Sequence, residues 1–426
     1  MKSNITIILI TVILFGCSKK IENQLPNIVF ILADDFGTEV LGCYGGSTYS
    51  TPNIDALAET GLKFNQCYSA PLCSPSRVKL LTGRYGFRTG QKWGYIPPNE
   101  ITFGHLLKGA GYKTAISGKW QMALLKDDPT HIKKMGFDES CVFGWHEGPR
   151  YHEPYIYENG EIKTGVKDKY GPNVYVEHLI DFIKKNKDDR FLAYYSMSLP
   201  HEISNDMKTP PPFGAKGRYE TYKENVEYAD LLVGKVIQTL DDLNIRKKTL
   251  IIFSGDNGTP YEYITKFENG KYIEEPVYSK IRDTVLQGGK KFMTDAGTHV
   301  PLIANWQGVT LQGEINNDII DFSDFMPTLI ELSKAKLPND RIIDGNSFAP
   351  QIMGKKGNPR KWAYQQWEGK AWIRSQEWKL YEQGDLFDMI NDPYEKHPID
   401  QANDNEESQK IRNYLSKELT KLKTNK

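Results

Sequence analysis

Short, continuous apolar runs alternate along the chain with longer segments in which apolar residues recur every three or four positions. The runs cover residues 28–32, 114–117, 191–198, 250–254 and 302–306. Continuous runs of this length are typical of strands that are buried on both faces. Helical spacing occurs between them, at 175–187 and 222–243. The alternation predicts an α/β fold with a mostly parallel central sheet and helices on both faces. Ligand sites of such folds lie beyond the carboxyl ends of the strands.

The pattern changes after about residue 335. Short apolar segments separated by turn residues follow, and they cover 362–367, 371–374, 378–381 and 386–389. Such segments predict a small antiparallel sheet, and the charged stretch 406–423 predicts a surface helix. We therefore predict two folded units, an α/β domain over residues 26–335 and a C-terminal subdomain over 336–426.

The first residues have the pattern of a targeting segment. Lys2 precedes an apolar run over residues 5–15, which is too short to cross a bilayer comfortably. The run ends in Gly16-Cys17 and resembles a bacterial lipoprotein signal, with residues 1–16 as the signal peptide and lipid on Cys17. The resemblance implies an exported lipoprotein, anchored to a membrane in the periplasm or at the cell surface. An ordinary secretory peptide, in which Cys17 has no role, is the alternative.

Composition narrows the classes of partner and the sources of stability. The 426 residues include 54 Lys+Arg and 54 Asp+Glu, so no net charge attracts nucleic acid, and we expect no nucleic-acid partner. Of the five cysteines, Cys17 belongs to the signal and Cys73 is a candidate for chemistry. The remaining three, Cys43, Cys67 and Cys141, can form one disulfide at most. We therefore expect stability to come mainly from an apolar core.

Two groups of oxygen-bearing side chains follow two of the predicted strands. Asp34 and Asp35 come directly after the first apolar run, and Asp256 and Asn257 come after the fourth. Adjacent carboxylates are costly unless a cation neutralises them. Two such strand ends in one parallel sheet can converge on one ion, and oxygen ligands without a His or thiolate set favour Ca²⁺ or Mg²⁺ over zinc. The alternative is an ordinary turn, in which Asp and Gly are common.

Cys73 lies at the start of another predicted helix, whose apolar positions run from Val78 to Leu81. Pro75 suits the first helical turn, where its missing N–H costs nothing, and Arg77 lies one turn after Cys73. A helix N-terminus beside an arginine stabilises an anion and also activates a thiolate. A buried structural cysteine and a reactive thiol therefore both remain open interpretations.

The segment Cys73-Ser74-Pro75-Ser76-Arg77, with Leu81-Thr82-Gly83-Arg84 after it, resembles the signature of the type I, formylglycine-dependent sulfatase family. In that family the cysteine of C-x-P-x-R is oxidised to formylglycine after translation. Further motifs are similar to those of the family and occur in the same order. They are Ala33-Asp34-Asp35-Phe36-Gly37, Gly118-Lys119-Trp120, Pro200-His201, Asp256-Asn257-Gly258, Gly288-Gly289-Lys290 and Leu386-Phe387-Asp388. The resemblance covers nearly the whole mature chain. It implies an alkaline phosphatase-like fold, a sulfuric ester hydrolase and a maturation enzyme that modifies Cys73.

The same resemblance implies the ligands of a calcium ion. Asp34, Asp35, Asp256 and Asn257 match the metal-binding motifs of the family, and the modified Cys73 completes the set. Oxygen donors of this kind suit Ca²⁺. The implied cofactors are therefore Ca²⁺ and the formylglycine formed from Cys73.

Four further residues are implied in catalysis and substrate binding. Arg77 supports the modified residue, and Lys119 and Lys290 neutralise the sulfate oxygens as charge builds up. His201 protonates the leaving alcohol, with Lys290 as a second candidate for this role. A single lysine is more often a surface charge and a single histidine a structural residue. The roles of Lys119 and His201 therefore rest on their positions at strand ends, where the sites of α/β folds lie.

The sequence departs from the family pattern at two places. Gln121 follows Gly118-Lys119-Trp120 where the family has a histidine, and a glutamine cannot act as a base at neutral pH. This puts the regeneration of the nucleophile in question. The segment 295–301 replaces a more common acidic Gly-Gly-Ile-Arg form, and we predict that His299 within it contacts the substrate.

Three functions are consistent with these residues. The first is a sulfatase that acts on a sulfated carbohydrate, because bacterial surface lipoproteins often process glycans. The second is a phosphonate or phosphate monoester hydrolase of the same superfamily. The third is a catalytically impaired glycan-binding lipoprotein, which Gln121 would explain. We predict sugar contacts in the aromatic segment 145–157 and in the loop 210–213.

Overall fold

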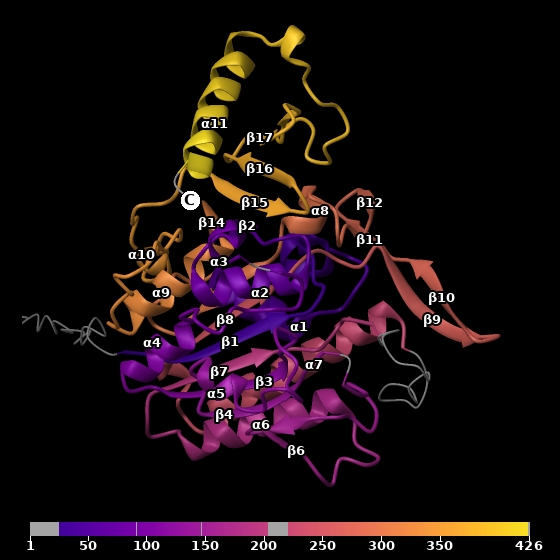
Figure 1. Ribbon diagram of the computed structural model, residues 1–426, viewed down its shortest axis with the longest axis vertical. Coiled ribbons are helices and arrows are strands. Elements are labelled where there is room, and N and C mark those ends of the chain that lie inside the picture. Colours follow the sequence, from indigo (N-terminus) through magenta and orange to yellow (C-terminus); the bar gives the residue numbers. More distant parts are fainter. Residues whose placement is uncertain (1–24, 91, 146, 203–219, 425–426) are drawn as a thin grey trace, which may run out of the picture.

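The computed structural model describes residues 25–90, 92–145, 147–202 and 220–424 (Figure 1). The predicted signal peptide 1–16, Cys17 and the predicted sugar-contacting loop 210–213 lie outside these residues. Within the described part of the chain, no helix is both long enough and apolar enough to cross a membrane.

A 10-stranded sheet forms the centre of the molecule (Figure 1). Its strands, in spatial order, are β14 (Glu314–Asp321), β2 (Leu62–Tyr68), β13 (Leu302–Asn305), β8 (Thr249–Gly255), β1 (Asn27–Ala33), β7 (Phe191–Ser196), β3 (Lys113–Lys119), β4 (Glu139–Phe143), β5 (Tyr157–Glu158) and β6 (Glu161–Ile162). The middle strands β8, β1, β7, β3 and β4 are parallel to one another, which confirms the mostly parallel sheet. The run 302–306 does form a strand, β13, but it is antiparallel to both neighbours. A continuous apolar run specifies burial and leaves strand direction open.

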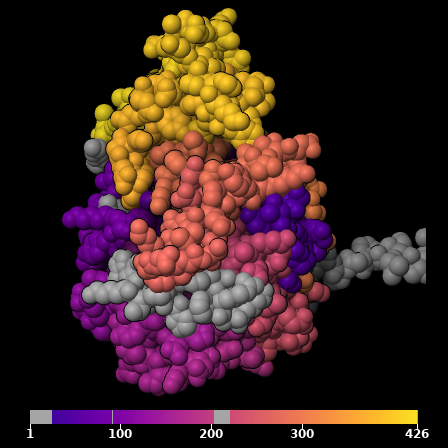
Figure 2. Space-filling model, turned by 90° about the vertical axis from the view of Figure 1, so that its right-hand side faces the viewer, coloured from indigo at the N-terminus to yellow at the C-terminus, as the bar shows by residue number. Residues whose placement is uncertain are grey.

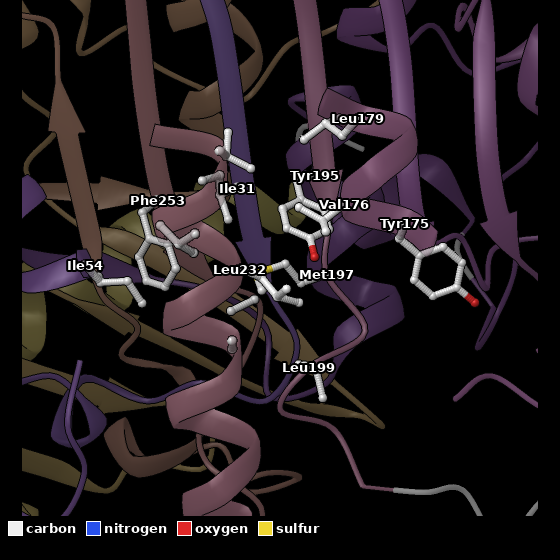
Figure 3. Packing of buried hydrophobic residues seen from close by; sticks show 14 of the residues in the cluster. Ile31, Ile54, Tyr175, Val176, Leu179, Tyr195, Met197, Leu199, Leu232 and Phe253 are labelled. Carbon is white, nitrogen blue, oxygen red and sulfur yellow. The ribbon is translucent and has the colours of Figure 1, made fainter. Parts of the chain in front are cut away.

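β1 is buried on both faces, as its continuous apolar sequence predicts. Val29 and Ile31 belong to the apolar cluster on one face of the sheet, and Phe30 and Leu32 belong to the cluster on the other. Successive side chains of a strand point to opposite faces, so one strand supplies both clusters. Figure 3 shows Ile31 and Leu232, a residue of a covering helix, in the first of these clusters.

Helices cover both faces of the sheet. The face of Ile31 packs against α1 (Pro52–Glu59), α6 (Gly171–Lys185) and α7 (Tyr222–Asp242). The opposite face packs against α2 (Cys73–Thr82), α4 (Phe103–Gly109) and α9 (Phe325–Leu332). The shorter helices are α3 (Gly86–Thr89), α5 (His131–Lys134), α8 (Asp295–Thr298) and α10 (Ala349–Ile352). The predicted helices 175–187 and 222–243 are thus confirmed as α6 and α7, within a few residues at their ends.

The C-terminal part forms the small antiparallel sheet that the sequence predicts. Its strands are β15 (Ala363–Trp367), β16 (Lys370–Arg374), β17 (Trp378–Tyr381) and β18 (Leu386–Asp388), and α11 (Glu406–Thr424) packs on β16 and β17. These C-terminal residues gather in one block, orange to yellow in Figure 2, at one end of the molecule. The predicted division between residues 335 and 336 falls in the loop after α9 and stays a prediction.

Two hairpins were not predicted. They are β9 (Glu262–Glu268) with β10 (Lys271–Pro276), and β11 (Tyr278–Ile281) with β12 (Thr284–Gln287). The first hairpin projects from the body of the molecule (Figure 1). The exposed residues of β10 carry no apolar run, so the signal used for the other strands is missing.

Candidate active site

The register between β1 and β8 brings the two oxygen-bearing groups together. Ala33 pairs with Gly255 in the parallel ladder, so the next residues, Asp34 and Asp256, leave the sheet side by side. The backbone N–H of Asp256 donates to the carbonyl of Ala33 at 3.0 Å, which continues the ladder by one step. Both carboxylates are buried. The convergence expected from the two strand ends is therefore present.

Asp35 is turned into the same cluster by its backbone. Its φ of 65° lies in the left-handed region, which non-glycine residues seldom adopt outside turns and functional sites. The Asp35 N–H donates to Asp256 Oδ1 at 3.0 Å, and Asn257 Nδ2 donates to Asp35 Oδ1 at 2.8 Å. Tyr222 from α7 donates its hydroxyl to the Asp35 carbonyl at 2.8 Å. The bend at Asp35 is therefore held by hydrogen bonds to the segment after β8 and to α7.

Helix α2 places Cys73 and Arg77 beside these carboxylates. Cys73 is the first residue of the helix and is buried. Its sulfur and one carboxylate oxygen each from Asp34 and Asp256 lie within 4.8 Å of one another. Arg77 Nε donates to Asp256 Oδ2 at 2.8 Å, and Arg77 Nη2 lies 3.9 Å from Asp34 Oδ1. The prediction that Cys73 lies at a helix N-terminus beside Arg77 is confirmed.

The donor set of this cluster fits a hard divalent cation. Asn257 Oδ1 is buried and has no hydrogen-bond partner among the described residues, whereas buried polar atoms are almost always paired. Burial raises the pKa of Asp256, and the adjacent Asp34 raises it further. A positive ion would lower the energetic cost of ionising the buried Asp256 carboxyl group. The same ion would accept Asn257 Oδ1 as a ligand. Asp34, Asp35, Asp256 and Asn257 would hold it, with Cys73 at its side.

Two lysines surround the carboxylates. Lys119, the last residue of β3, donates from Nζ to both Asp34 oxygens at 2.8 and 2.6 Å. Lys290 Nζ donates to Asp35 Oδ2 at 2.5 Å. Burial alone would raise the pKa of Asp34, but Lys119 and Arg77 hold it well below its ordinary value. Burial favours the neutral amine of Lys290, but Asp35 keeps its pKa above the ordinary value, so this lysine is charged.

His201 is held as a neutral imidazole. Its Nδ1 lies 2.8 Å from the Glu202 carbonyl, and because a carbonyl only accepts, Nδ1 carries the proton. Nε2 lies 3.8 Å from Asp35 Oδ2. Burial, with Lys290 nearby, lowers the pKa of His201 to about 4. A role as proton donor therefore requires that His201 first take up a proton, which the negative charge of a bound ester would favour.

Ser196 is a site residue that the sequence interpretation missed. Its hydroxyl accepts from Arg77 Nη1 and donates to the Lys119 carbonyl at 2.5 Å. It therefore connects the arginine of α2 to the end of β3. Gly118 lets the end of β3 lie this close to Ser196, since a Cβ at residue 118 would lie 2.0 Å from the Ser196 carbonyl oxygen. A serine at the end of an apolar run carries no distinct signal in the sequence.

Gln121 and His299 are placed differently from the cluster residues. Gln121 is buried, has a φ of 42°, and accepts at its carbonyl from Ser74 Oγ at 3.3 Å, next to Cys73. Its Nε2 has no partner among the described residues.

His299 stacks on Tyr68 with ring centroids 5.2 Å apart, and its Nε2 lies 2.7 Å from the Asn65 carbonyl. It lines a separate cavity with Asp295 and Arg374, and its predicted contact with the substrate stays a prediction.

Comparison with known proteins gives consistent matches over nearly the whole chain. The family model Sulfatase matches residues 26–335, and the model N-sulphoglucosamine sulphohydrolase, C-terminal, matches residues 288–425. The N-acetylgalactosamine-6-sulfatase of Canis lupus familiaris is 30% identical over 410 residues, covering 85% of this chain and 74% of that protein. The steryl-sulfatase of Rattus norvegicus is 29% identical over 419 residues, covering 77% of this chain and 70% of that protein. The chain is also similar to the crystal structure of Ps i-CgsB in complex with k-i-k-neocarrahexaose, with a TM-score of 0.74 and 27% sequence identity. The match covers 94% of this chain and 93% of that one.

Proposed function

Because this chain belongs to the sulfatase family and is a sulfate ester hydrolase, we propose that it releases sulfate from a sulfated carbohydrate. Its nucleophile is formylglycine made from Cys73, and its metal is Ca²⁺. Relatives support the substrate class, since one is named for sulfated N-acetylgalactosamine and one solved structure holds a neocarrahexaose.

The observation that carries the proposal is the convergence of Cys73, Asp34 and Asp256 within 4.8 Å. Burial raises the pKa of the Cys73 thiol, and the two carboxylates raise it further. An unmodified cysteine here is therefore a neutral thiol at pH 7 and a poor nucleophile. The same surroundings suit an oxygen nucleophile beside a cation, which supports modification of Cys73.

The cationic residues around Cys73 supply the charge for a sulfate ester. Formylglycine would supply a hydroxyl of its hydrated aldehyde, and a bound Ca²⁺ would supply positive charge to a sulfate oxygen. Arg77 holds Asp256 in place through a 2.8 Å hydrogen bond. Lys119 and Lys290 present ammonium groups that stabilise negative charge as it develops on the sulfate. Lys290 keeps its proton in the free site, so it can donate toward the leaving oxygen.

Mass spectrometry of the peptide that spans Cys73 tests the modification. Protein from its native host should give the mass of the aldehyde or its hydrate at this residue. A plain thiol there, in protein that cleaves sulfate esters, would contradict the proposed nucleophile. A thiol in inactive protein would favour a glycan-binding protein on a sulfatase scaffold.

Two assays test the reaction and the substrate. Turnover of 4-nitrophenyl sulfate should exceed that of 4-nitrophenyl phosphate, and the reverse order would indicate a phosphate monoester hydrolase. Sulfate release from sulfated glycosaminoglycan and carrageenan oligosaccharides, followed by ion chromatography, tests the carbohydrate substrate. Cleavage of aryl sulfate and steroid sulfate without cleavage of any saccharide would overturn this part of the proposal.

Export and lipid anchoring at Cys17 are a separate part of the proposal. The wild-type protein should partition into the detergent phase of Triton X-114 when expressed in a bacterium that matures lipoproteins. The variant Cys17→Ala should move to the aqueous phase. Equal partitioning of the two proteins would remove the anchor from the proposal.

A further inference from the structure

Three tryptophans from distant segments of the chain meet in the folded protein. Trp93 lies in the loop between α3 and α4, Trp145 follows β4, and Trp367 ends β15. The ring centroid of Trp93 lies 5.5 Å from that of Trp145 and 5.9 Å from that of Trp367. We call these three residues the tryptophan cluster. Each comes from a different part of the chain, so the cluster exists only in the folded protein.

Backbone contacts connect the tryptophan cluster to the residues around Cys73. The N–H of Ile96, in the loop of Trp93, donates to the Met122 carbonyl at 2.9 Å. The preceding residue, Gln121, accepts from Ser74 Oγ at 3.3 Å. Trp93 therefore lies on a loop that is bonded to the segment leaving β3, which in turn is bonded to the start of α2.

A cavity connects the other side of the cluster to the same helix. Trp367 and Pro75 both line a cavity of about 460 Å³, and Pro75 lies two residues after Cys73. Gln366, Glu368 and Lys370 also line it, which places hydrogen-bonding side chains next to the aromatic surface. Large aromatic surface together with a few polar groups is the usual composition of a ligand site.

The backbone at Gly94 is adapted to hold Trp145. The indole Nε1 of Trp145 donates to the Gly94 carbonyl at 2.9 Å. Gly94 has a φ of +68°, and a Cβ at this position would lie 2.5 Å from the same Nε1. Any other residue would be strained and would displace the ring. The position of Trp145 is therefore built into the loop.

Trp93 leaves 46% of its surface exposed. Aromatic surface left open on a folded protein, in a cluster rather than singly, marks a site of interaction. The C–H groups of a pyranose ring pack on the electron-rich face of an indole. Hydroxyl groups of the same sugar can bond to the polar side chains of the adjoining cavity.

We propose that the tryptophan cluster binds a pyranose ring next to the ring that carries the sulfate ester, and so favours oligosaccharides over sulfated monosaccharides. This inference rests on the proposed carbohydrate substrate. The loop of Trp93 is bonded to the segment after β3, and Trp367 lines a cavity together with Pro75 of α2. On this proposal, a saccharide whose sulfate lies at Cys73 extends over the cluster.

The ratio of kcat/KM for a sulfated oligosaccharide to that for the matching sulfated monosaccharide tests the cluster. Glycosaminoglycan and carrageenan fragments of one to six units serve as probes. Trp93→Ala and Trp367→Ala should each lower the ratio about tenfold, mostly through KM. Trp93→Phe should restore most of it, and Gly94→Ala should lower it because Trp145 is displaced. Tyr278→Ala is the matched control, since Tyr278 is 55% exposed and does not line the cavity of Trp367.

Two outcomes separate this inference from the proposed function. If wild-type protein cleaves the saccharides and the ratio is unchanged in both alanine variants, the cluster has no such role while the function stands. An equal loss for both substrate lengths would indicate a structural role and would also overturn the inference.

Binding to inactive Cys73→Ser protein, measured by tryptophan fluorescence, gives a readout without turnover. Saccharide binding that Trp93→Ala abolishes supports the cluster even if no saccharide is cleaved. Saccharide binding that is the same with and without Trp93, or no saccharide binding at all, would overturn it.

Discussion

Helix α2 contributes to two buried charge clusters that differ in how completely their polar atoms are paired. Near its C-terminal end, Lys79 Nζ lies 2.7 Å from Asp321 Oδ1 and donates to the Tyr364 carbonyl at 2.8 Å. Arg360 completes this second cluster with a bidentate hydrogen bond to Asp324. Its Nε donates to Asp324 Oδ2 at 2.8 Å, and its Nη2 donates to Asp324 Oδ1. No side-chain nitrogen or oxygen of these four charged residues is buried without a partner in the described part of the chain.

The cluster at the N-terminal end of the same helix is different. Its carboxylates also face arginine and lysine, but Asn257 Oδ1 is left without a partner among the described residues. A charge cluster that the chain itself completes acts as a structural link, here between α2 and the C-terminal sheet. A cluster left with an unpaired acceptor is prepared for a ligand. The comparison predicts that changes in one cluster mainly affect stability and changes in the other mainly affect activity.

The largest effect is expected at Cys73. Cys73→Ser cannot yield the aldehyde from cysteine by the proposed modification, so kcat for aryl sulfate should fall by at least about 10⁴-fold. The free energy of unfolding, measured by urea titration, should change little because the serine hydroxyl would lie beside the Asp34 and Asp256 carboxylates, which can accept its hydrogen bond. Cys67→Ser, in the apolar core, is the matched control, and it should lose about 1–2 kcal/mol of stability with turnover retained. Substantial activity in Cys73→Ser would contradict the assigned nucleophile.

The second cluster should show the opposite pattern. Lys79→Met leaves Asp321 buried without its cation, and breaking a buried pair in this way costs about 3–5 kcal/mol. Urea unfolding measures the loss, and kcat per folded molecule should stay close to that of the wild type. The double variant Lys79→Met/Asp321→Asn should recover part of the stability, because no charge is then left unpaired. Unchanged stability in Lys79→Met would show that the cluster is not a structural link.

Calcium should stabilise the folded protein through the cluster at the N-terminal end of α2, and not through the second cluster. A thousandfold excess of free Ca²⁺ over its dissociation constant stabilises a folded protein by about 4 kcal/mol, and a chelator should remove this gain. Asn257→Ala should weaken calcium binding by at least about tenfold, seen as a shift in the calcium dependence of Tm. The exposed Asn391→Ala serves as control. A Tm that does not respond to calcium in the wild type would remove the metal from this site.

The sequence predicts those parts of the fold that follow from burial and from motif position. Asp34 and Asp256 follow the runs that form β1 and β8, and parallel pairing of these strands brings the two residues together. The direction of β13 could not be predicted, because an apolar run looks the same in either orientation. The roles of Ser196 and Tyr222 depend on contacts between elements far apart in the chain. The unpaired oxygen of Asn257 is likewise a property of the folded site, since asparagine after a strand is common in turns.

The smallest of the effects concerns the pH dependence that His201 adds to stability. Burial lowers its pKa to about 4, whereas an unfolded histidine titrates near its ordinary value of about 6.5. The folded protein therefore binds fewer protons than the unfolded chain between these values. The stability that comes from the neutral imidazole is present above about pH 6.5 and is lost as the pH falls toward 4. The shift corresponds to about 3 kcal/mol over this range.

His201→Gln should therefore give a flatter curve of unfolding free energy against pH between 6.5 and 4 than the wild type. The measurement uses urea unfolding in the presence of a chelator, so that calcium binding does not contribute. His397→Gln, at an exposed position, is the matched control. Equal slopes for His201→Gln and the wild type would mean that His201 is not held neutral by burial. In that case the imidazole could already be protonated in the free site, and His201 could donate to the leaving oxygen without first taking up a proton.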